Sequence, residues 1–234
     1  ENEIAKAANR PKITELKVSF SRDGFHWDRP YRDAFIPATR VPGSWDRGYV
    51  QSVGGICTVV GDQLRFYYIG FKGGDSSSYM HSNGATGMAT LRRDGFASMS
   101  TTGEGSLTTR PVKFSGKYMF VNVNCPAGEL KVEILDKNNK VIDGFSADKC
   151  KAVTIDSTIQ QVEWNGASDL SSLAGQEVRF RFKLKNGDLY AFWVSPSTNG
   201  ESNGYVAGGG PGYTSNKDTE GKKAYEKASG FQKF

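Results

Sequence analysis

The sequence predicts an all-β protein, in which a partial β-propeller of about two blades is followed by a β-sandwich. Three observations lead to this fold class. Short runs rich in β-branched and aromatic residues recur at intervals of about 8 to 12 residues. A turn motif built on Asp-Gly-Phe occurs twice in the first half of the chain. After residue 105 the pattern of the strands changes, and apolar and polar positions begin to alternate cleanly.

Strands account for nearly all of the regular elements that we expect. Each run is bounded by Gly, Asp, Asn or Pro, which favour turns. Short hairpin turns are expected at residues 61–62, 137–139 and 186–188, which makes the strands antiparallel. Helical pattern is confined to residues 3–9 and 218–229. The expected strands lie within residues 15–21, 56–62, 64–71, 86–92, 117–124, 129–136, 161–166 and 177–196.

The repeated turn motif predicts repeated blades. Its first copy, residues 21–27, reads SRDGFHW and resembles the Asp-box turns of propeller blades. We expect Asp23 to accept hydrogen bonds from backbone amides of the turn and Gly24 to adopt a positive φ. The aromatic residue that follows should pack against the neighbouring hairpin. The second copy lies at residues 89–96, around Asp94, and we expect both copies to be structural rather than catalytic.

Three segments follow from these patterns. Residues 1–105 are expected to be the C-terminal blades of a propeller, residues 106–196 a β-sandwich, and residues 197–234 a Gly-rich C-terminal arm. A four-stranded blade takes about 45 to 60 residues and a propeller needs at least about four blades. Residues 1–105 therefore supply two blades at most and cannot close a ring. We expect the missing N-terminal blades to come from a longer form of the same protein or from a second chain.

Charge and hydropathy exclude two classes of partner. The chain carries 30 Lys and Arg against 25 Asp and Glu, a net charge of +5, but the cations are scattered, so no nucleic acid is expected. The densest stripe, at residues 179, 181, 183 and 185, alternates with apolar residues as the solvent face of a strand does. No apolar run approaches the roughly 20 residues that cross a bilayer, so no membrane segment is expected. Any export signal is expected to have been removed or to lie on a missing segment.

The cysteines and histidines predict no metal site, and no motif indicates a cofactor. The three Cys show neither CxxC nor Cys/His metal spacing. Cys57 lies in an apolar strand pattern and is expected in the core. Cys125 and Cys150 either form a disulfide in an oxidising compartment or stay free. His26 belongs to the repeated turn, and His81 is interpreted as a surface residue of a Gly/Ser-rich loop.

A candidate binding site follows a Pro-marked loop, where Trp45, Asp46, Tyr49 and Gln51 begin a new strand. In a propeller the first strand of each blade lines the central channel. Trp stacks on the apolar face of a sugar ring, and Asp and Gln bind sugar hydroxyls. The alternative is structural: Trp45 and Tyr49 cap the blade core, and Asp46 caps a turn.

Long motifs of the chain resemble the C-terminal half of bacterial proteins related to glycoside hydrolase family 32. These motifs are FSRDGFHWDRP, GSWDRGYVQSVGGICTVVGDQLRFYYIGF, ATGMATLRRDGFASM, GSLTTRPVKFSGKYMFVNVN and SNGYVAGGGPG. The resemblance implies a five-bladed propeller followed by a β-sandwich, carbohydrate-active ancestry and a secreted or periplasmic protein. It also implies an Asp nucleophile, a Glu general acid and an assisting Asp, mainly from the first three blades. Between Glu15 and Glu104 the chain has no Glu, so no catalytic residue is assigned.

The resulting prediction is the C-terminal part of a glycoside hydrolase-like protein, whose role is to complete the propeller and its sugar-binding cleft. We expect a carbohydrate ligand and no hydrolysis by these 234 residues alone. The alternative is a non-catalytic carbohydrate-binding or structural interaction module. An exposed aromatic row on the sandwich would favour a lectin-like module, with Tyr118, Trp164, Tyr190 and Trp193 as candidates. Open blade edges pairing with a separate chain would favour a structural role.

Overall fold

The computed structural model describes residues 2–7, 12–54, 57–73 and 80–231. Strands make up 41% of the structure and helices 8%, so the prediction of an all-β protein is confirmed. Several antiparallel sheets are present, and none closes into a ring within the described residues. The chain divides into two compact units. The first unit contains residues 1–57 and 65–90, and the second contains residues 58–64 and 91–234.

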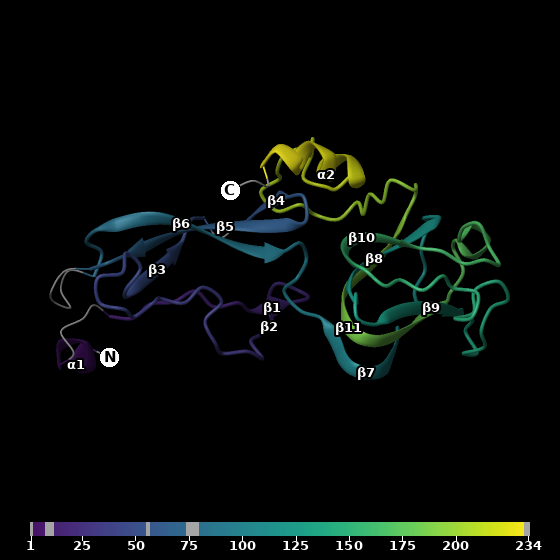
Figure 1. The fold of residues 1–234 in the computed structure, drawn as a ribbon, viewed down its shortest axis with the longest axis horizontal. Helices are drawn as coiled ribbons and strands as arrows, with labels where there is room; N and C mark the ends of the chain where they lie inside the picture. The colour runs from purple at the N-terminus through teal and green to yellow at the C-terminus, as the bar shows by residue number, and fades with distance from the viewer. Residues whose placement is uncertain (1, 8–11, 55–56, 74–79, 232–234) are drawn as a thin grey trace. The chain divides into compact units, whose positions relative to one another are not determined.

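The elements follow one another in a simple order, labelled in Figure 1. The elements up to residue 92 are α1 (Asn2–Ala7), β1 (Phe20–Ser21), β2 (Trp27–Asp28), β3 (Tyr49–Ser52), β4 (Thr58–Val60), β5 (Gln63–Phe71) and β6 (Gly84–Arg92). The elements after it are β7 (Met99–Thr108), β8 (Tyr118–Asn124), β9 (Glu129–Leu135), β10 (Asp156–Val162), η2 (Ser171–Leu173), β11 (Arg179–Ser195), α2 (Lys222–Ala228) and η3 (Ser229–Phe231). The helix expected at residues 3–9 corresponds to α1, and residues 8 and 9 lie outside the described residues. The helix expected at residues 218–229 corresponds to α2, which begins at Lys222.

In the first unit, β3 pairs with β5 from residue 65 onward, and β6 also pairs with β5. One face of this sheet carries the core of the unit, where Val50 packs with Ile36 and Ala38. Partly buried residues surround that cluster: Ile13, Leu16, Phe35, Phe66, Tyr68 and Ala89. Thr14 extends the edge of β3, because its amide donates to Gly48 O (2.8 Å) and its carbonyl accepts from Val50 N (2.9 Å). The first unit is thus a sheet with one covered face.

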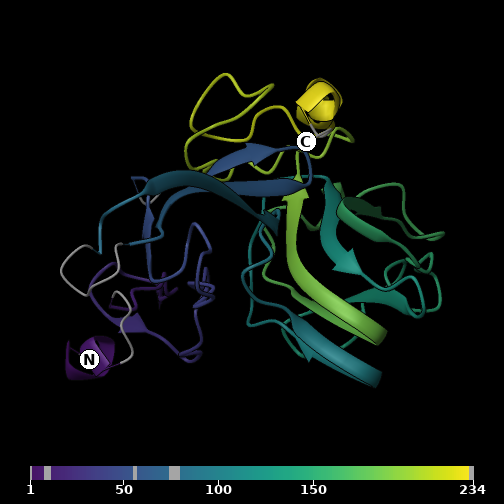
Figure 2. The ribbon, with the colours of Figure 1, turned by 60° about the vertical axis from the view of Figure 1, so that its left-hand side comes forward.

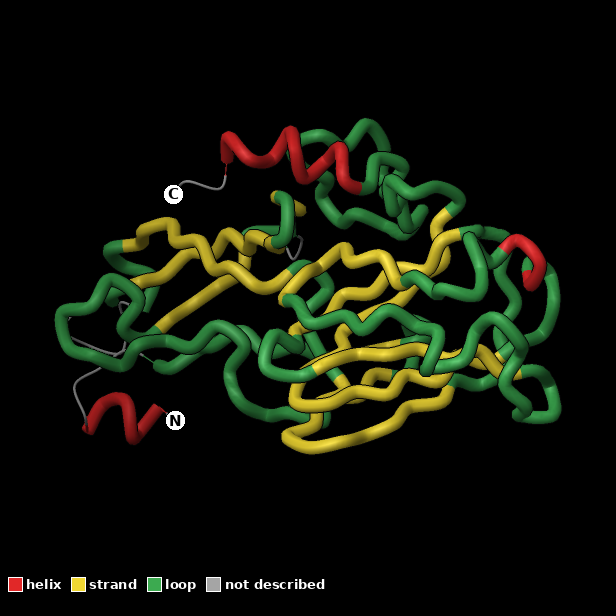
Figure 3. Tube along the Cα trace, turned by 45° about the vertical axis from the view of Figure 1, so that its right-hand side comes forward, coloured by secondary structure: helices red, strands yellow, loops and turns green. Residues whose placement is uncertain are grey.

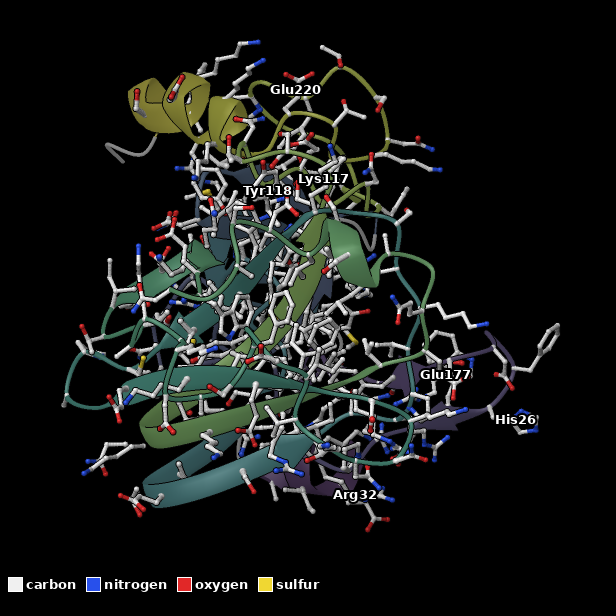
Figure 4. The ribbon with its side chains drawn as sticks, turned by 90° about the vertical axis from the view of Figure 1, so that its right-hand side faces the viewer. His26, Arg32, Lys117, Tyr118, Glu177 and Glu220 are labelled. Carbon is white, nitrogen blue, oxygen red and sulfur yellow. The ribbon has the colours of Figure 1, made fainter. Side chains whose placement is uncertain are left out.

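The first Asp-Gly-Phe turn has the hydrogen bonds that the sequence predicts. Asp23 Oδ1 accepts from Phe25 N (2.9 Å) and His26 N (2.8 Å), and Gly24 has φ +79°. The turn joins β1 to β2, and the Trp27 indole donates to Gly24 O (3.1 Å). The expected packing of the aromatic residue is wrong, since Phe25 is 87% exposed. Figure 4 shows the His26 side chain projecting outward from this hairpin.

The second copy of the motif has the same Asp-Gly-Phe sequence but forms a different turn. Here Asp94 itself has the positive φ (53°), and Gly95 N donates to Arg92 O (2.9 Å). The backbone of Arg93 is held from both sides, because its amide donates to Asp62 O (2.7 Å) and its carbonyl accepts from Asn122 (2.6 Å). The repeat in sequence is therefore not a repeat in local structure.

The second unit is built around β11, which spans 17 residues and is paired on both sides. The sheet order is β10-β8-β11-β7, and β9 pairs with the first half of β11. Figure 2 shows the long curved β11 with β7 beside it. Inward side chains from β8, β9 and β11 form one core, which includes Met119, Val121, Val123, Leu130, Val132, Ile134, Phe180 and Phe182.

The hairpin turn expected at residues 186–188 is wrong. Asn186 has a positive φ (43°), but the strand continues through a register shift between Lys185 and Gly187. A β-carbon at Gly187 would lie 2.6 Å from Asn124 O and 2.7 Å from Cys125 Cβ. The Asn-Gly signal thus marks a bulge at which β11 changes partners from β9 to β8.

The boundary expected at residue 105 falls inside β7, whose residues 99–108 pair with β11. The Gly-rich segment after residue 196 belongs to the second unit and is packed against it. Val59 N donates to Gly209 O (2.7 Å), and a β-carbon at Gly210 would lie 1.7 Å from Val59 O. Close backbone approach therefore explains Gly210, and a positive φ (76°) explains Gly209. Figure 3 shows this segment as loops leading to α2.

The three cysteines are buried and none forms a disulfide, so Cys125 and Cys150 are not joined. The Cys125 thiol donates to Val153 O (3.2 Å), and the Cys150 sulfur accepts from Val132 N (3.3 Å). Cys57 is buried as expected. Among the described residues, no helix combines the length and the apolarity that crossing a bilayer requires.

Candidate functional site

The four candidate sugar contacts lie on or just before β3, and the alternation of this strand separates them. Tyr49 and Gln51 point to one face of the sheet, and Val50, which is fully buried, points to the other. The register pairs Tyr49 with Phe71, Val50 with Gly70 and Gln51 with Ile69. Side chains of paired residues share a face, so each candidate can be assigned to the covered face or to the opposite one.

Trp45 lies on the covered face. A β-carbon at Gly70 would lie 2.5 Å from the indole Cζ3, and one at Gly87 would lie 2.5 Å from Cη2. The indole also packs against the Tyr68 ring at 5.5 Å between centroids. Trp45 is 38% exposed, so it covers the margin of the core. This position agrees with the structural alternative, in which the ring caps the core.

Asp46 is also on the covered side and is only 6% exposed. Its Oδ1 accepts hydrogen bonds from Ser44 Oγ and from Thr39 Oγ1 (2.9 Å). Its backbone carbonyl accepts from Thr39 N (3.2 Å), which ties the loop to the start of β3. Burial and, to a smaller extent, the charge of Asp46 raise the pKa of Tyr68. The Asp46 carboxylate closes a turn, and its burial leaves little surface for a ligand.

Tyr49 and Gln51 lie on the face opposite the core. The Tyr49 ring meets the Phe71 ring edge to face at 5.6 Å and the His81 ring at 4.6 Å. His81 also contacts Phe71, at 5.5 Å between ring centroids. Gln51 is exposed. The structure therefore brings two of the four candidates together and places the other two elsewhere.

We call the outward side chains of this sheet the open face, and define it as Tyr49, Gln51, Tyr67, Ile69, Phe71 and Met88. Tyr67 is 42% exposed, and Met88 has similar exposure. A β-carbon at Gly84 would lie 2.9 Å from the Phe71 ring, so a larger residue there would press against that ring. The open face is thus an array of aromatic and apolar groups with one amide.

Sequence reasoning missed Tyr67, Phe71 and the contact of His81 with them. The signal was present in the run LRFYYIGF, because strict alternation puts Tyr67, Ile69 and Phe71 on one face. Both faces of that run are apolar, so the pattern alone did not show which one was covered. Ala89 and Gly87 on β6 resolve this, since both pack on the covered face.

The aromatic row proposed for a lectin-like second unit is not exposed. Trp164 is buried and donates to Val132 O (2.9 Å). Trp193 is half-buried, donates to Gly200 O (3.0 Å) and stacks on Phe120. Tyr190 lies under the Arg92 guanidinium (4.7 Å). Tyr118 is half-buried at the start of β8, beside Lys117 (Figure 4). These four aromatics therefore support the fold and offer no platform for a ligand.

Two carboxylates near Arg93 are engaged in structural contacts. Asp218 is buried and accepts from Arg93 Nη2 (2.7 Å) through Oδ2 and from Gly221 N (2.9 Å) through Oδ1. Asp94 Oδ2 lies 3.8 Å from Arg93 Nε. Glycoside cleavage needs two carboxyl groups free to act on substrate. These two are held by a guanidinium, so we assign no catalytic residue to them.

Among the described residues, no group of three or more His, Cys, Asp or Glu side chains could hold a metal ion. Comparisons with protein-family models, with curated proteins and with solved structures found no match to this chain. Any function of this chain therefore has to be inferred from the residues of the open face.

Proposed function

We propose that the chain binds carbohydrate through the open face and is a non-hydrolytic part of a glycoside hydrolase-like protein. The observation that supports this proposal is the cluster of Tyr49, Phe71 and His81 beside the exposed amide of Gln51. The rings offer apolar surface to the C–H face of a sugar, and the amide both donates to and accepts from hydroxyls. A sheet face suits an extended glycan better than it suits a small ligand, which binds in an enclosed pocket.

Preorganisation supports the same proposal. Phe71 and His81 hold the Tyr49 ring edge-on, so little rotamer freedom is lost when a sugar packs against it. Tyr67 lies on the next outward row of β5, two residues from Ile69. Trp45 and Asp46 act indirectly in this proposal, because they fix the loop and the covered face from which Tyr49 projects.

The finer architecture is part of the proposal. The first unit would supply blades to a propeller whose remaining blades, together with the catalytic carboxylates, lie in the same protein or in a second chain. The Asp23 turn supports this assignment because its amide hydrogen bonds are those of an Asp-box. The second unit would be the sandwich, and the protein would be secreted or periplasmic, as the family resemblance implies.

Glycan binding tests the function directly. We expect the wild-type chain to bind at least one member of a panel of neutral oligosaccharides, and Tyr49→Ala and Gln51→Ala to weaken that binding by about tenfold each, roughly 1.4 kcal/mol. Tyr205→Ala is the matched control, since Tyr205 is an exposed tyrosine of the second unit. Equal affinities for Tyr49→Ala and wild type, or no binding across the panel, would overturn the proposal. Incubation with the same glycans should release no reducing ends.

A second candidate is an interaction module that docks on another protein. Its support is the exposed Phe25 and Trp27 on a turn that is rigidly hydrogen-bonded. Aromatic side chains on a fixed scaffold are common anchors of protein interfaces. This candidate predicts a native assembly with a second, unlike chain, which the mass of the complex would reveal. It also predicts that Trp27→Ala weakens the assembly, whereas Tyr49→Ala leaves it intact.

A further inference from the structure

The second unit has a groove whose lining residues come later in the sequence than those of the open face. Its side chains are mostly charged, whereas those of the open face are mostly aromatic and apolar. It is formed on the outer face of β9, β11 and β7, with a volume of about 530 Å³. Most of its lining residues are charged or polar, namely Glu104, Ser106, Glu129, Lys131, Asp148, Lys183 and Lys185, and the others are Gly105, Ala147 and Leu184. The three strands are labelled in Figure 1. None of these residues belongs to the carbohydrate site proposed above.

The strand register places two lysines directly opposite each other in this groove. Lys183 of β11 pairs with Lys131 of β9 on one side and with Ser106 of β7 on the other. The row therefore reads Lys131, Lys183, Ser106 across the three strands. Like charges directly opposite each other on a sheet are unfavourable. This row is accordingly a place where a bound negative charge would be stabilising.

Neighbouring carboxylates relieve the repulsion only in part. Lys183 Nζ lies 3.3 Å from Glu133, but Glu133 is 4% exposed and already pairs with Arg181 at 2.8 Å. Lys131 Nζ lies 3.7 Å from Glu129. The Lys131–Glu129 pair is long and partly exposed, and such pairs contribute little, about 0–1 kcal/mol. Glu133 keeps Arg181 as a partner if Lys183 turns away. Both ammonium groups can therefore turn toward a ligand.

The next row has the opposite character. Lys185 pairs with Glu129 on one side and with Glu104 on the other, and its Nζ is 3.7 Å from Glu104. Asp148 adds a third carboxylate to the lining. Carboxylates accept hydrogen bonds from hydroxyl groups and repel anions. A ligand that fits both rows carries one negative group on the lysine row and hydroxyls on the acidic row.

The wall of the groove is rigid. Ala147 is buried, and the adjoining turn is closed by hydrogen bonds from Lys149 N and Cys150 N to Ser146 O (3.2 and 3.0 Å). Cys150 and Phe145 on either side of this turn belong to the core. A site built on paired strands and a fixed turn loses little conformational entropy when it binds.

We propose that this groove binds an acidic saccharide. The anionic group, a carboxylate or a sulfate, lies between Lys131 and Lys183 within reach of the Ser106 hydroxyl. Sugar hydroxyls donate to Glu104 and Glu129. The three carboxylates of the lining oppose polyanions, so the ligand carries one charge per bound unit. This site goes beyond the proposed function, because it lies in the other unit and selects charge.

Titration calorimetry with three probes tests the site: digalacturonic acid, its neutral counterpart digalactose, and galactose 6-sulfate. We expect at least one of the two acidic probes to bind, about tenfold or more tighter than digalactose, and to weaken as salt is raised. The double variant Lys131→Gln/Lys183→Gln should lose about tenfold or more of that affinity. Lys140→Gln, an exposed lysine outside the groove, should bind as wild type does.

The outcomes separate this site from the open face. Tyr49→Ala should leave binding of the acidic probe unchanged, and Lys131→Gln/Lys183→Gln should leave binding to the neutral panel unchanged. Amide chemical shifts of residues 104–106, 129–131 and 183–185 should move on titration. Equal affinity for acidic and neutral probes, no binding of either acidic probe, or an unaffected double variant with a native spectrum would each refute the proposal. The acidic probe that binds with the higher affinity shows whether the site prefers a carboxylate or a sulfate.

Discussion

The Trp45 indole occupies the space above Gly70 that any larger residue would need. A β-carbon built on Gly70 lies 2.5 Å from Trp45 Cζ3 and 2.7 Å from Asp46 Cβ. Gly87, on the adjacent strand, has the same relation to the indole at 2.5 Å. Two neighbouring strands thus lack side chains where the ring packs. This fit fixes the loop before β3. It thereby also fixes the backbone position from which the Tyr49 side chain projects.

Gly70→Ala should therefore destabilise the first unit. The added methyl meets the indole and the Asp46 side chain, and overpacking of this kind costs about 1–3 kcal/mol. Chemical denaturation of wild type and variant measures the change. Gly103→Ala is the control, because nothing lies within 4 Å of a β-carbon there and its φ is not positive. We expect Gly103→Ala to change stability by less than about 0.5 kcal/mol.

A double-mutant cycle shows whether the ring itself is responsible. Trp45→Ala removes the clash with the indole and leaves only the contact with Asp46 Cβ, so Gly70→Ala should cost less in that background than in wild type. Additive effects of the two substitutions would show that Trp45 does not pack over Gly70 in solution.

The buried ion pair between Arg93 and Asp218 should be the most important charged contact of the second unit. Arg93 Nη2 lies 2.7 Å from Asp218 Oδ2, and the guanidinium also lies over the Tyr225 ring at 5.3 Å. Arg93→Met leaves the Asp218 carboxylate buried and without this partner, which costs about 3–5 kcal/mol. Unfolding in denaturant measures this loss. Hydrogen exchange at Gly221 N, which donates to Asp218, should become faster.

An exposed ion pair of equal length is the control for that substitution. Lys151 Nζ lies 2.8 Å from Glu163 Oε2, and both side chains are about half exposed. Lys151→Met should change stability by less than about 1 kcal/mol, because solvent screens the pair. Similar losses for Lys151→Met and Arg93→Met would contradict the role that burial plays in this prediction.

Local patterns predicted much of this fold, and tertiary contacts decided the remainder. The Gly61-Asp62 hairpin, the Asp23 turn and the alternation of β11 before its bulge could be derived from residue types alone. The bulge at Asn186-Gly187 could not be derived in this way, because a hairpin turn and a bulge favour the same residue types. The backbone of β8, which approaches Gly187 closely, selects the bulge.

The candidate site was also predictable only in part, because tertiary contacts decide which face of the sheet each side chain occupies. Trp45, Asp46, Tyr49 and Gln51 are close in sequence, and their residue types suit a sugar. A turn separates Asp46 from Tyr49, so the period of two within β3 cannot be extended back across it. Only the contact of Trp45 with Gly70 shows that the indole and Tyr49 lie on opposite faces.

The three thiols should be unreactive in the folded protein and fully reactive after unfolding. Burial raises the pKa of the Cys125 and Cys150 thiols, so little thiolate is present near neutral pH. Protein purified without reductant should show three free thiols in denaturant when titrated with a disulfide reagent. A count of one would instead indicate that Cys125 and Cys150 pair under oxidising conditions.

The Asp23 turn should titrate well below the range of an ordinary aspartate. The hydrogen bond from the His26 ring (2.6 Å), followed by those from the amides of His26 and Phe25, lowers the pKa of the Asp23 carboxyl. A folded-state pKa below the unfolded value, about 3.9, means that the turn is stabilised above that value. This stabilisation is lost as the pH falls through the folded-state pKa.

Carboxyl carbon shifts of Asp23, followed by NMR from pH 6 downward, measure this pKa. His26→Ala removes the largest contribution and should move the midpoint upward, toward that of an ordinary aspartate. Ser21→Ala removes the smallest contribution and should move it least, which makes it the matched control. The order of the two shifts is the sharper test, because both variants alter the same exposed turn. If Ser21→Ala moved the midpoint further than His26→Ala, the His26 ring would not be the principal partner of Asp23 in solution.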